Sequence, residues 1–177
     1  MTSYGAKELT ESFRTVRKNT IQVAEDIPED KYGFSAAPET RTVGQLLAHI
    51  AFGNGFQHQI HAVERRATLD GIDFPSMLQK LWSEEKKPRS KAGIIEVLKK
   101  TGEDWAVWLD GLSNDFLAER VQMPHGSTAT KSRLEMLLSA KEHEMHHRGQ
   151  LMLIERMIGI VPHLTREMQA RMAPAAK

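Results

Sequence analysis

Apolar residues recur every three or four positions along most of this chain, which is the period of an amphipathic helix. These repeats predict long helices over residues 6–25, 42–66, 90–112 and 132–159. Shorter helices are expected around residues 76–81 and after Pro162. No competing strand pattern is evident. The pattern therefore predicts an all-α protein in which residues 1–177 form a single four-helix-bundle domain, with short extra helices in a loop and at the C-terminus.

Two pairs of polar residues mark the places where two of the long helices begin. Thr42 is followed three residues later by Gln45, and Ser132 is followed at the same spacing by Glu135. Such pairs have the form of a capping box, in which two side chains satisfy the free amides at a helix N-terminus. We therefore expect the second long helix to start at Thr42 and the fourth at Ser132.

Composition and charge exclude several classes of protein. Apolar residues make up 40% of the chain and charged residues 27%, which is typical of a globular domain. Lys and Arg total 24 against 23 for Asp and Glu, so the basic excess of a nucleic-acid-binding surface is missing and we expect no nucleic-acid partner. The absence of cysteine excludes a disulfide framework, a cysteine-based zinc site and a cysteine nucleophile.

The chain also lacks the hydrophobic segments that mark membrane or secreted proteins. It has no apolar run of roughly 18 residues, which a membrane-spanning helix requires. Residues 1–8 lack the apolar stretch of a secretory signal. We therefore expect a cytoplasmic protein that does not bind membranes.

The chemistry of the chain is concentrated in the fourth predicted helix. His143 and His147 are four residues apart and project roughly 40° from each other, so both imidazoles can reach one ion. Such a pair also occurs by chance. Here, however, Leu151 and Ile154 continue the same stripe, so both rings should point into the bundle, where an unpaired polar group is costly. Imidazole ligands suit Zn, Ni, Fe or Mn, and the residues alone do not choose among them.

A third ligand is available on the second predicted helix. His49 lies on its inward stripe, and Gly44 and Gly53 would allow that helix to approach the fourth one closely. His146 lies roughly 60° from His143 on the other side and is the weaker ligand. The remaining histidines are out of phase, in a loop or beyond the bundle, and we expect them to be solvated surface residues: His58, His61, His125 and His163.

Two stretches resemble a known family. The sequence IPEDKYGFSAAPETRTVGQLLAHI at residues 27–50 is similar to the first loop and second helix of the DinB-like (DinB/YfiT) proteins. The sequence EHEMHHRGQL at residues 142–151 is similar to their fourth helix. The resemblance implies an up-down-down-up bundle that binds one divalent metal ion on His49, His143 and His147, with open positions for water or substrate. It also implies a homodimer, and it does not imply DNA binding.

The function that this resemblance implies is a metal-dependent enzyme acting on a small-molecule substrate. Family members include S-transferases and isomerases that use low-molecular-weight thiols, so a site that activates a small thiol cosubstrate is the first hypothesis. Hydrolysis by a water molecule activated at the metal is the second hypothesis, and a non-catalytic metal-binding stress-response module is the third. Residues 143–147 also match the H-E-x-x-H pattern of zinc proteases, with Glu144 as general base and Glu167 as a conceivable third ligand. The lack of strands argues against a protease, and Glu144 is then expected to face solvent.

Two further residues of the fourth helix are candidates for substrate binding. Gln150 lies one heptad after His143 and on the same face, although a helix-packing contact explains it equally well. Arg148 could bind an anionic substrate, and the alternative is a structural ion pair with an acid on a neighbouring helix.

Overall fold

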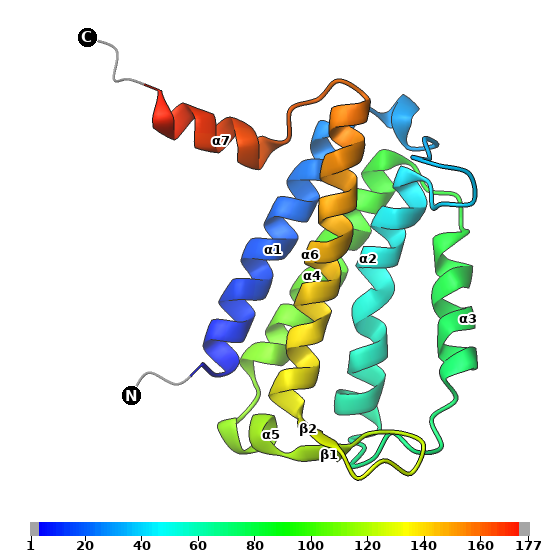
Figure 1. Ribbon diagram of the computed structural model, residues 1–177, viewed down its shortest axis with the longest axis vertical. Helices are drawn as coiled ribbons and strands as arrows, with labels where there is room; N and C mark the ends of the chain where they lie inside the picture. The colour runs from blue at the N-terminus through cyan, green and yellow to red at the C-terminus, as the bar shows by residue number, and fades with distance from the viewer. Residues whose placement is uncertain (1–3, 174–177) are drawn as a thin grey trace.

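The computed structural model describes residues 4–173, so the first three and last four residues of the predicted domain lie outside the described part. Four long helices form the bundle, and they are α1 (Ala6–Asp26), α2 (Val43–His58), α4 (Lys91–Asp110) and α6 (Arg133–Met157). In Figure 1, α1 and α6 run upward, whereas α2 and α4 run downward. The predicted up-down-down-up four-helix bundle is therefore confirmed.

Helix α3 (Phe74–Glu85) makes this topology possible, because it carries the chain from the lower end of α2 back to the upper end, where α4 begins. It packs against α2 on the outside of the bundle. The helix is longer than the short one expected around residues 76–81. Asp73 starts it by accepting a hydrogen bond from the Ser76 amide, and Pro75 occupies the first turn. The extra turn at its C-terminal end brings Glu85 to the bundle.

The expected helix starts are confirmed. At the start of α2, Thr42 accepts a hydrogen bond from the Gln45 amide at 3.2 Å, and its own amide donates to Gln45 Oε1 at 2.9 Å. At the start of α6, Ser132 and Glu135 form the same reciprocal pair. Both helices carry the histidines singled out above. Their ends are thus fixed by local hydrogen bonds.

The connections contain small elements that the periodicity did not reveal. A 3₁₀ turn, η1 (Glu29–Lys31), follows α1, and a π-helical segment, η2 (Gln59–Val63), continues α2. After α4, a short α5 (Asn114–Ala118) precedes the antiparallel strands β1 (Arg120–Gln122) and β2 (Thr130–Ser132), which pair Val121 with Lys131. Strands of three residues are too short for an alternating pattern to be visible in the sequence. The C-terminal helix α7 (His163–Met172) projects sideways at the upper end of the bundle, on the side of α1.

The core contains three apolar clusters. A small one joins η2 and β1 to α6, and the two larger ones are stacked along the bundle. The upper one contains Val23, Leu47, Ile50, Leu98 and Leu151, and the lower one contains Leu9, Phe13, Trp105, Leu109 and Leu137. All four long helices contribute to the upper cluster, and α1, α4 and α6 to the lower one. Within residues 4–173, none of the helices combines the length and the apolarity that crossing a bilayer requires.

Candidate metal centre

Three histidine side chains from two helices converge on one point beside α3. The Nε2 atom of His143 lies 2.9 Å from Nε2 of His49 and 3.1 Å from Nε2 of His147. Their ligand atoms all lie within 4.8 Å of one another. Imidazole nitrogens bound to one tetrahedral zinc ion at about 2.0–2.1 Å would be about 3.4 Å apart. We call these three residues the triad, and its spacing matches that of ligands to a single ion.

Two hydrogen bonds on the far side of the rings determine which nitrogen atoms point inward. Nδ1 of His49 lies 2.7 Å from Oε1 of Glu85, and Nδ1 of His147 lies 2.7 Å from Oε1 of Gln150. Both oxygens accept hydrogen bonds, so each Nδ1 carries the proton and each Nε2 presents a lone pair to the centre. The carboxylate of Glu85 is itself held by Arg41, whose Nε donates to Oε2 at 2.7 Å.

This arrangement leaves more acceptors than donors at the centre. A proton on His143 Nε2 could satisfy either His49 or His147, but not both. Burial, together with the charges of His147 and His49, lowers the pKa of His143 to about 4. Burial also lowers the pKa of His49 and of His147, although their hydrogen bonds to Glu85 and Gln150 oppose it. Three neutral imidazoles with converging lone pairs fit a divalent cation.

Gly53 allows His143 to reach this position. A Cβ atom on Gly53 would lie 3.3 Å from Cε1 and 3.5 Å from Nδ1 of the His143 ring, which is tighter than a normal contact. The ring of His143 therefore packs directly against the backbone of α2. The close approach expected from the glycines of this helix is found at Gly53.

A groove of about 670 Å³ lies between α2, α3 and α6 and leads to the triad. We call it the triad groove. Its lining includes Arg41, Trp82, Glu85, Lys86, His147 and Gln150. Burial alone would raise the pKa of Glu85, but hydrogen bonds from Arg41 and His49 outweigh this effect and lower it, so the carboxylate is ionised. The Arg41 side chain is 35% exposed and also lowers the pKa of all three histidines, which places its positive charge near the centre. The groove thus combines charges of both signs, with Glu39 and Glu85 beside Arg41 and Lys86, and the exposed aromatic ring of Trp82.

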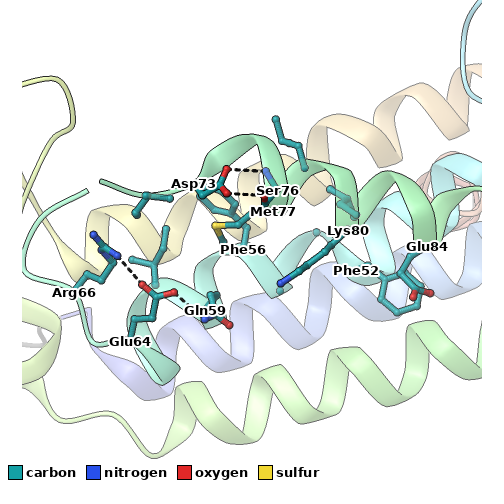
Figure 2. Close-up of a pocket in the computed structure, with 16 residues that line it drawn as sticks. Phe52, Phe56, Gln59, Glu64, Arg66, Asp73, Ser76, Met77, Lys80 and Glu84 are labelled. Atoms are coloured by element: carbon teal, nitrogen blue, oxygen red, sulfur yellow. Dashed lines mark hydrogen bonds and ion pairs between the residues drawn. The ribbon is translucent and has the colours of Figure 1, made fainter. Parts of the chain in front are cut away.

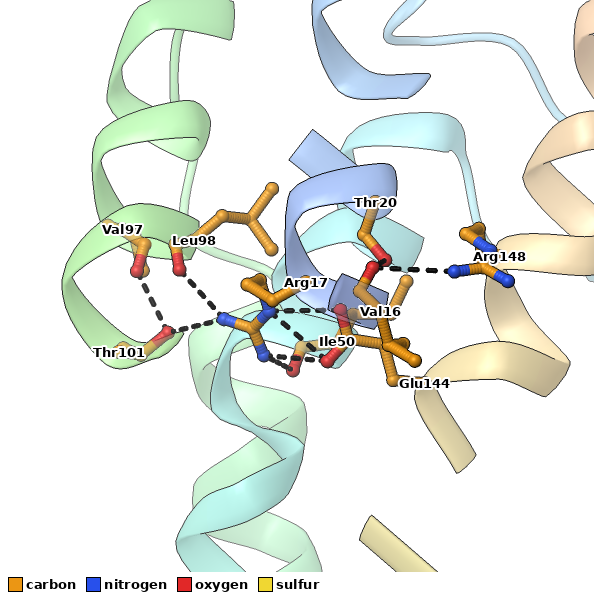
Figure 3. A network of polar contacts seen from close by, with 9 residues as sticks. All are labelled: Val16, Arg17, Thr20, Ile50, Val97, Leu98, Thr101, Glu144 and Arg148. Atoms are coloured by element: carbon orange, nitrogen blue, oxygen red, sulfur yellow. Dashed lines mark hydrogen bonds and ion pairs between the residues drawn. The ribbon is translucent and has the colours of Figure 1, made fainter. Parts of the chain in front are cut away.

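Glu144 does not face solvent, and that expectation is wrong. Its side chain is 2% exposed and forms an ion pair with Arg17 of α1, whose Nε donates to Oε1 at 2.9 Å and whose Nη2 donates to Oε2 at 2.9 Å. Arg17 also donates to the carbonyl oxygens of Leu98 in α4, at 2.8 Å, and Ile50 in α2, at 3.5 Å (Figure 3). The guanidinium therefore joins all four helices. Glu144 is engaged in this network and is not free to act as the general base of an H-E-x-x-H site.

The comparisons with known proteins agree with this architecture. The sequence profile of the DinB superfamily matches residues 12–151. The chain belongs to the DinB superfamily. No curated protein matches it significantly.

Three solved structures illustrate the DinB-superfamily fold. A DinB-like protein from Bacillus subtilis, YjoA, is 20% identical, with a TM-score of 0.62 over 86% of this chain and 92% of that one. YfiT from B. subtilis, described as a probable metal-dependent hydrolase with an unusual four-helix bundle topology, is 14% identical, with a TM-score of 0.66 over 90% and 91%. The colibactin self-resistance protein ClbS, in complex with dsDNA, is 15% identical, with a TM-score of 0.65 over 88% and 98%. At these identities, the likeness shows the fold alone.

The two candidate substrate-binding residues have different environments in this DinB-superfamily chain. Gln150 lines the triad groove, where its amide oxygen orients His147 and its amide nitrogen lies 3.3 Å from Nε2 of His146. Arg148 instead donates to the carbonyl oxygen of Val16 at 3.4 Å (Figure 3). Burial lowers its pKa, opposed by the charge of Glu144, and no carboxylate of residues 4–173 lies within ion-pair distance of it. Arg148 thus contacts α1 and forms no ion pair with an acid of a neighbouring helix within residues 4–173, whereas its role in substrate binding stays a prediction.

Two other histidines also differ from the sequence-based expectation. His61 is fully buried, and its Nδ1 lies 2.9 Å from Nη1 of Arg133, whereas a surface position was expected. Burial and the Arg133 charge lower its pKa to about 4. It lies in η2, whose π-helical turn changes the angular phase that a 3.6-residue period assumes. His163 is also buried, because the start of α7 packs against α1 near Asn19.

The remaining candidates lie on the surface. His58 and His125 are exposed, as expected, and so is His146, the weaker ligand candidate. Glu167 is exposed on α7 and lies 3.7 Å from Arg171, away from the triad, so it is not a third ligand. The residue that sequence reasoning missed is Glu85. A helix extended by one turn beyond residue 81, with an acid at its end, would have been the signal for it.

Proposed function

We propose that this protein is a metal-dependent enzyme that holds one divalent transition-metal ion on His49, His143 and His147. The observation that carries the proposal is the convergence of three Nε2 atoms. Two of them, in His49 and His147, present lone pairs to the centre because the Nδ1 atoms of those rings contact Glu85 and Gln150. Zn, Ni, Fe and Mn all suit such ligands. Three protein ligands also leave positions open, which is typical of catalytic sites.

The residues around the triad favour a small thiol as cosubstrate. A divalent ion at this position would lower the pKa of a thiol or water that it coordinates. Glu85 is held by Arg41 and His49, and Glu144 is held by Arg17, so neither buried carboxylate is free to act as a general base. A thiol, with a pKa of about 8.5, needs less help to ionise than water at about 15.7. The chain has no cysteine, so the thiol must come from solution.

In this S-transferase-like reaction, the protein binds and orients the reactants. Glu85 and Gln150 keep the His49 and His147 rings in place. Arg41 is paired with Glu85, but Lys86 forms no ion pair within the described residues, so its ammonium group is available to a thiolate or another anionic group. The exposed ring of Trp82 offers an apolar surface to the second substrate.

Metal-dependent hydrolysis is the second candidate. It is supported by the shared fold with YfiT, which is described as a probable metal-dependent hydrolase. In this case the groove residues would bind the hydrolysable substrate, and no free thiol would be needed.

An activity assay with the metal-loaded protein separates the alternatives. Small thiols are offered with an electrophilic acceptor, in parallel with ester and amide substrates without thiol, and His143→Ala serves as the inactive control. Turnover that requires both a thiol and His143, and that fails when the thiol is replaced by its hydroxyl analogue, supports the transferase. Turnover of esters or amides without thiol supports the hydrolase. Metal binding without either activity supports a non-catalytic module.

Two partner predictions stay open to measurement. Sedimentation of a species of about 20 kDa, the mass of one chain, would contradict the predicted homodimer. The near-neutral charge of +1 predicts no binding to nucleic acid, and titration of labelled duplex DNA tests this prediction.

A further inference from the structure

A second groove, of about 450 Å³, lies between α2 and α3 and is separate from the triad groove (Figure 2). On the α2 side, Phe52, Phe56 and Ile60 follow one another at helical spacing. On the α3 side, Met77 and Leu81 repeat this spacing. We call this space the α2–α3 groove. It shares no lining residue with the triad groove.

The two apolar faces of the α2–α3 groove close against each other only in part. Phe56 stacks on Phe74 with 5.4 Å between the ring centroids, and the Arg89 guanidinium lies 5.1 Å from the centre of the Phe52 ring, but the groove beside these contacts stays open. Protein interiors are normally packed to the density of organic crystals, and atoms that line a gap lose dispersion contacts on that side. A groove of this volume and composition is the size of a small-molecule site. An elongated apolar body would restore the missing contacts to both helices.

The charges around the groove indicate the chemistry of one end of this molecule. Glu64 is paired with Arg66 at 2.8 Å, and Glu84 is paired with Arg89 at 2.6 Å. Asp73 accepts hydrogen bonds from Ser76. Asp73 and Lys80 are the two lining charges that form no ion pair within the described part of the chain, and the Lys80 charge helps to lower the pKa of Asp73. Of the two, only the Lys80 ammonium group also forms no hydrogen bond there. Figure 2 shows its side chain extending from α3 toward α2.

We propose that the α2–α3 groove binds a molecule with an elongated apolar body and a single anionic end, such as a medium-chain carboxylate. The body lies between Phe52 and Phe56 of α2 and Met77 and Leu81 of α3. The anionic end is bound by Lys80. This proposal requires neither the triad nor its metal.

Calorimetric titration of the purified protein with decanoate, below its micellar concentration, tests the site. Two glycines provide a matched pair of variants, since a Cβ on either Gly55 or Gly149 would meet no atom within 4 Å, and both lie inside helices. Only Gly55 lines the α2–α3 groove. Gly55→Phe should therefore weaken decanoate binding by about tenfold or more, whereas Gly149→Phe should leave it unchanged. Equal binding by both variants, or no binding by the unmodified protein, would overturn the proposal.

The role of Lys80 is tested by reversing its charge. Lys80→Glu should weaken binding of decanoate by about tenfold and leave binding of decanol unchanged. Lys7→Glu makes the same change of net charge on α1, outside both grooves, and should have little effect. Both lysines are exposed, so neither change should unfold the protein. If decanoate and decanol respond equally to Lys80→Glu, or if the two variants weaken decanoate equally, the anionic end is wrongly assigned.

Discussion

Two faces of α6 use neighbouring residues in opposite ways. Toward α2 and α3, the Nε2 atoms of His143, His147 and His49 converge, and a single proton on His143 satisfies only one of the other two, so the protein alone leaves the centre of the triad one donor short. Toward α1 and α4, Glu144 is 2% exposed and accepts three hydrogen bonds from Arg17. His143 and Glu144 are adjacent in the chain, yet the first belongs to a cluster that lacks a hydrogen-bond donor and the second to a cluster whose hydrogen bonds are satisfied.

This difference separates structural from functional polar residues. A buried polar network whose members are all satisfied fixes one packing arrangement, and the Arg17–Glu144 network connects the four helices in this way. A buried cluster that lacks a partner is costly unless a ligand completes it. The H-E-x-x-H pattern mixes the two kinds of residue, so the motif alone does not reveal the role of its glutamate.

The largest expected effect is the loss of stability when the ion pair between Arg17 and Glu144 is broken. Glu144→Ala would leave the Arg17 guanidinium buried without its partner, and we expect it to lower the free energy of unfolding by about 3–5 kcal/mol. The double variant Arg17→Met/Glu144→Met, which replaces the pair by apolar groups of similar volume, should recover most of this loss. Urea unfolding measures both. A loss below about 1 kcal/mol in Glu144→Ala would show that the network contributes little.

Glu155 extends the comparison, because its carboxylate is fully buried on α6 and has no hydrogen-bond partner among residues 4–173. Burial and the nearby charge of Asp26 raise its pKa from 4.5 to about 7. The folded protein therefore binds this proton more tightly than the unfolded chain does. The contribution of Glu155 to stability should therefore be greatest below pH 4.5, fall as the pH rises to about 7, and be lower by about 3 kcal/mol above it.

The variant Glu155→Gln isolates this effect. It should remove the fall in stability between pH 4.5 and 7, so that the variant is more stable than the unmodified protein at pH 8 but not at pH 4. Thermal unfolding across this range measures the difference. Parallel pH profiles for the two proteins would contradict the raised pKa.

Glu85 of α3 contacts the triad, and its substitution should affect metal binding more than stability. Glu85→Gln weakens the hydrogen bond that orients His49 and disturbs the contact with Arg41, so we expect metal affinity to fall by about 10–100-fold. Competition with a chromophoric chelator measures this affinity. Glu84→Gln is the control, because Glu84 pairs with Lys87 and Arg89 instead of the triad. Equal losses of metal affinity in both variants would show that Glu85 has no specific role in metal binding.

The smallest expected effect distinguishes two glycines of α2. Gly55→Ala should stabilise the protein by about 1 kcal/mol through helix propensity, because its new Cβ meets nothing within 4 Å. Gly53→Ala should stabilise the protein less than Gly55→Ala does. It should also weaken metal binding, since its Cβ would lie 3.3 Å from Cε1 of His143. Unfolding and chelator competition test both variants. An unchanged metal affinity in Gly53→Ala would show that the His143 ring can move aside without cost.

The sequence predicted the bundle because its signals are local. The apolar period, together with the pairs Thr42–Gln45 and Ser132–Glu135, depends on residues three or four positions apart. The sequence also singled out His49, His143 and His147, and the structure brings these three residues together.

The environment of these residues was harder to predict, because it depends on contacts between distant segments. Glu85 reaches His49 across 36 positions, and Arg17 reaches Glu144 across 127. The prediction of a surface position for His61 was wrong for a different reason. The π-helical turn that contains His61 interrupts the 3.6-residue helical period from which its position was predicted.

Metal stoichiometry tests the central claim most directly. Elemental analysis of the dialysed protein, reconstituted with Zn, Ni, Mn or Fe, should be compared with that of His143→Ala and His146→Ala, which remove neighbouring histidines inside and outside the triad. We expect about one equivalent of metal in the unmodified protein and in His146→Ala, and none in His143→Ala, with helix content unchanged by circular dichroism. A full equivalent in His143→Ala, or no metal in the unmodified protein, would contradict the metal centre and the function built on it.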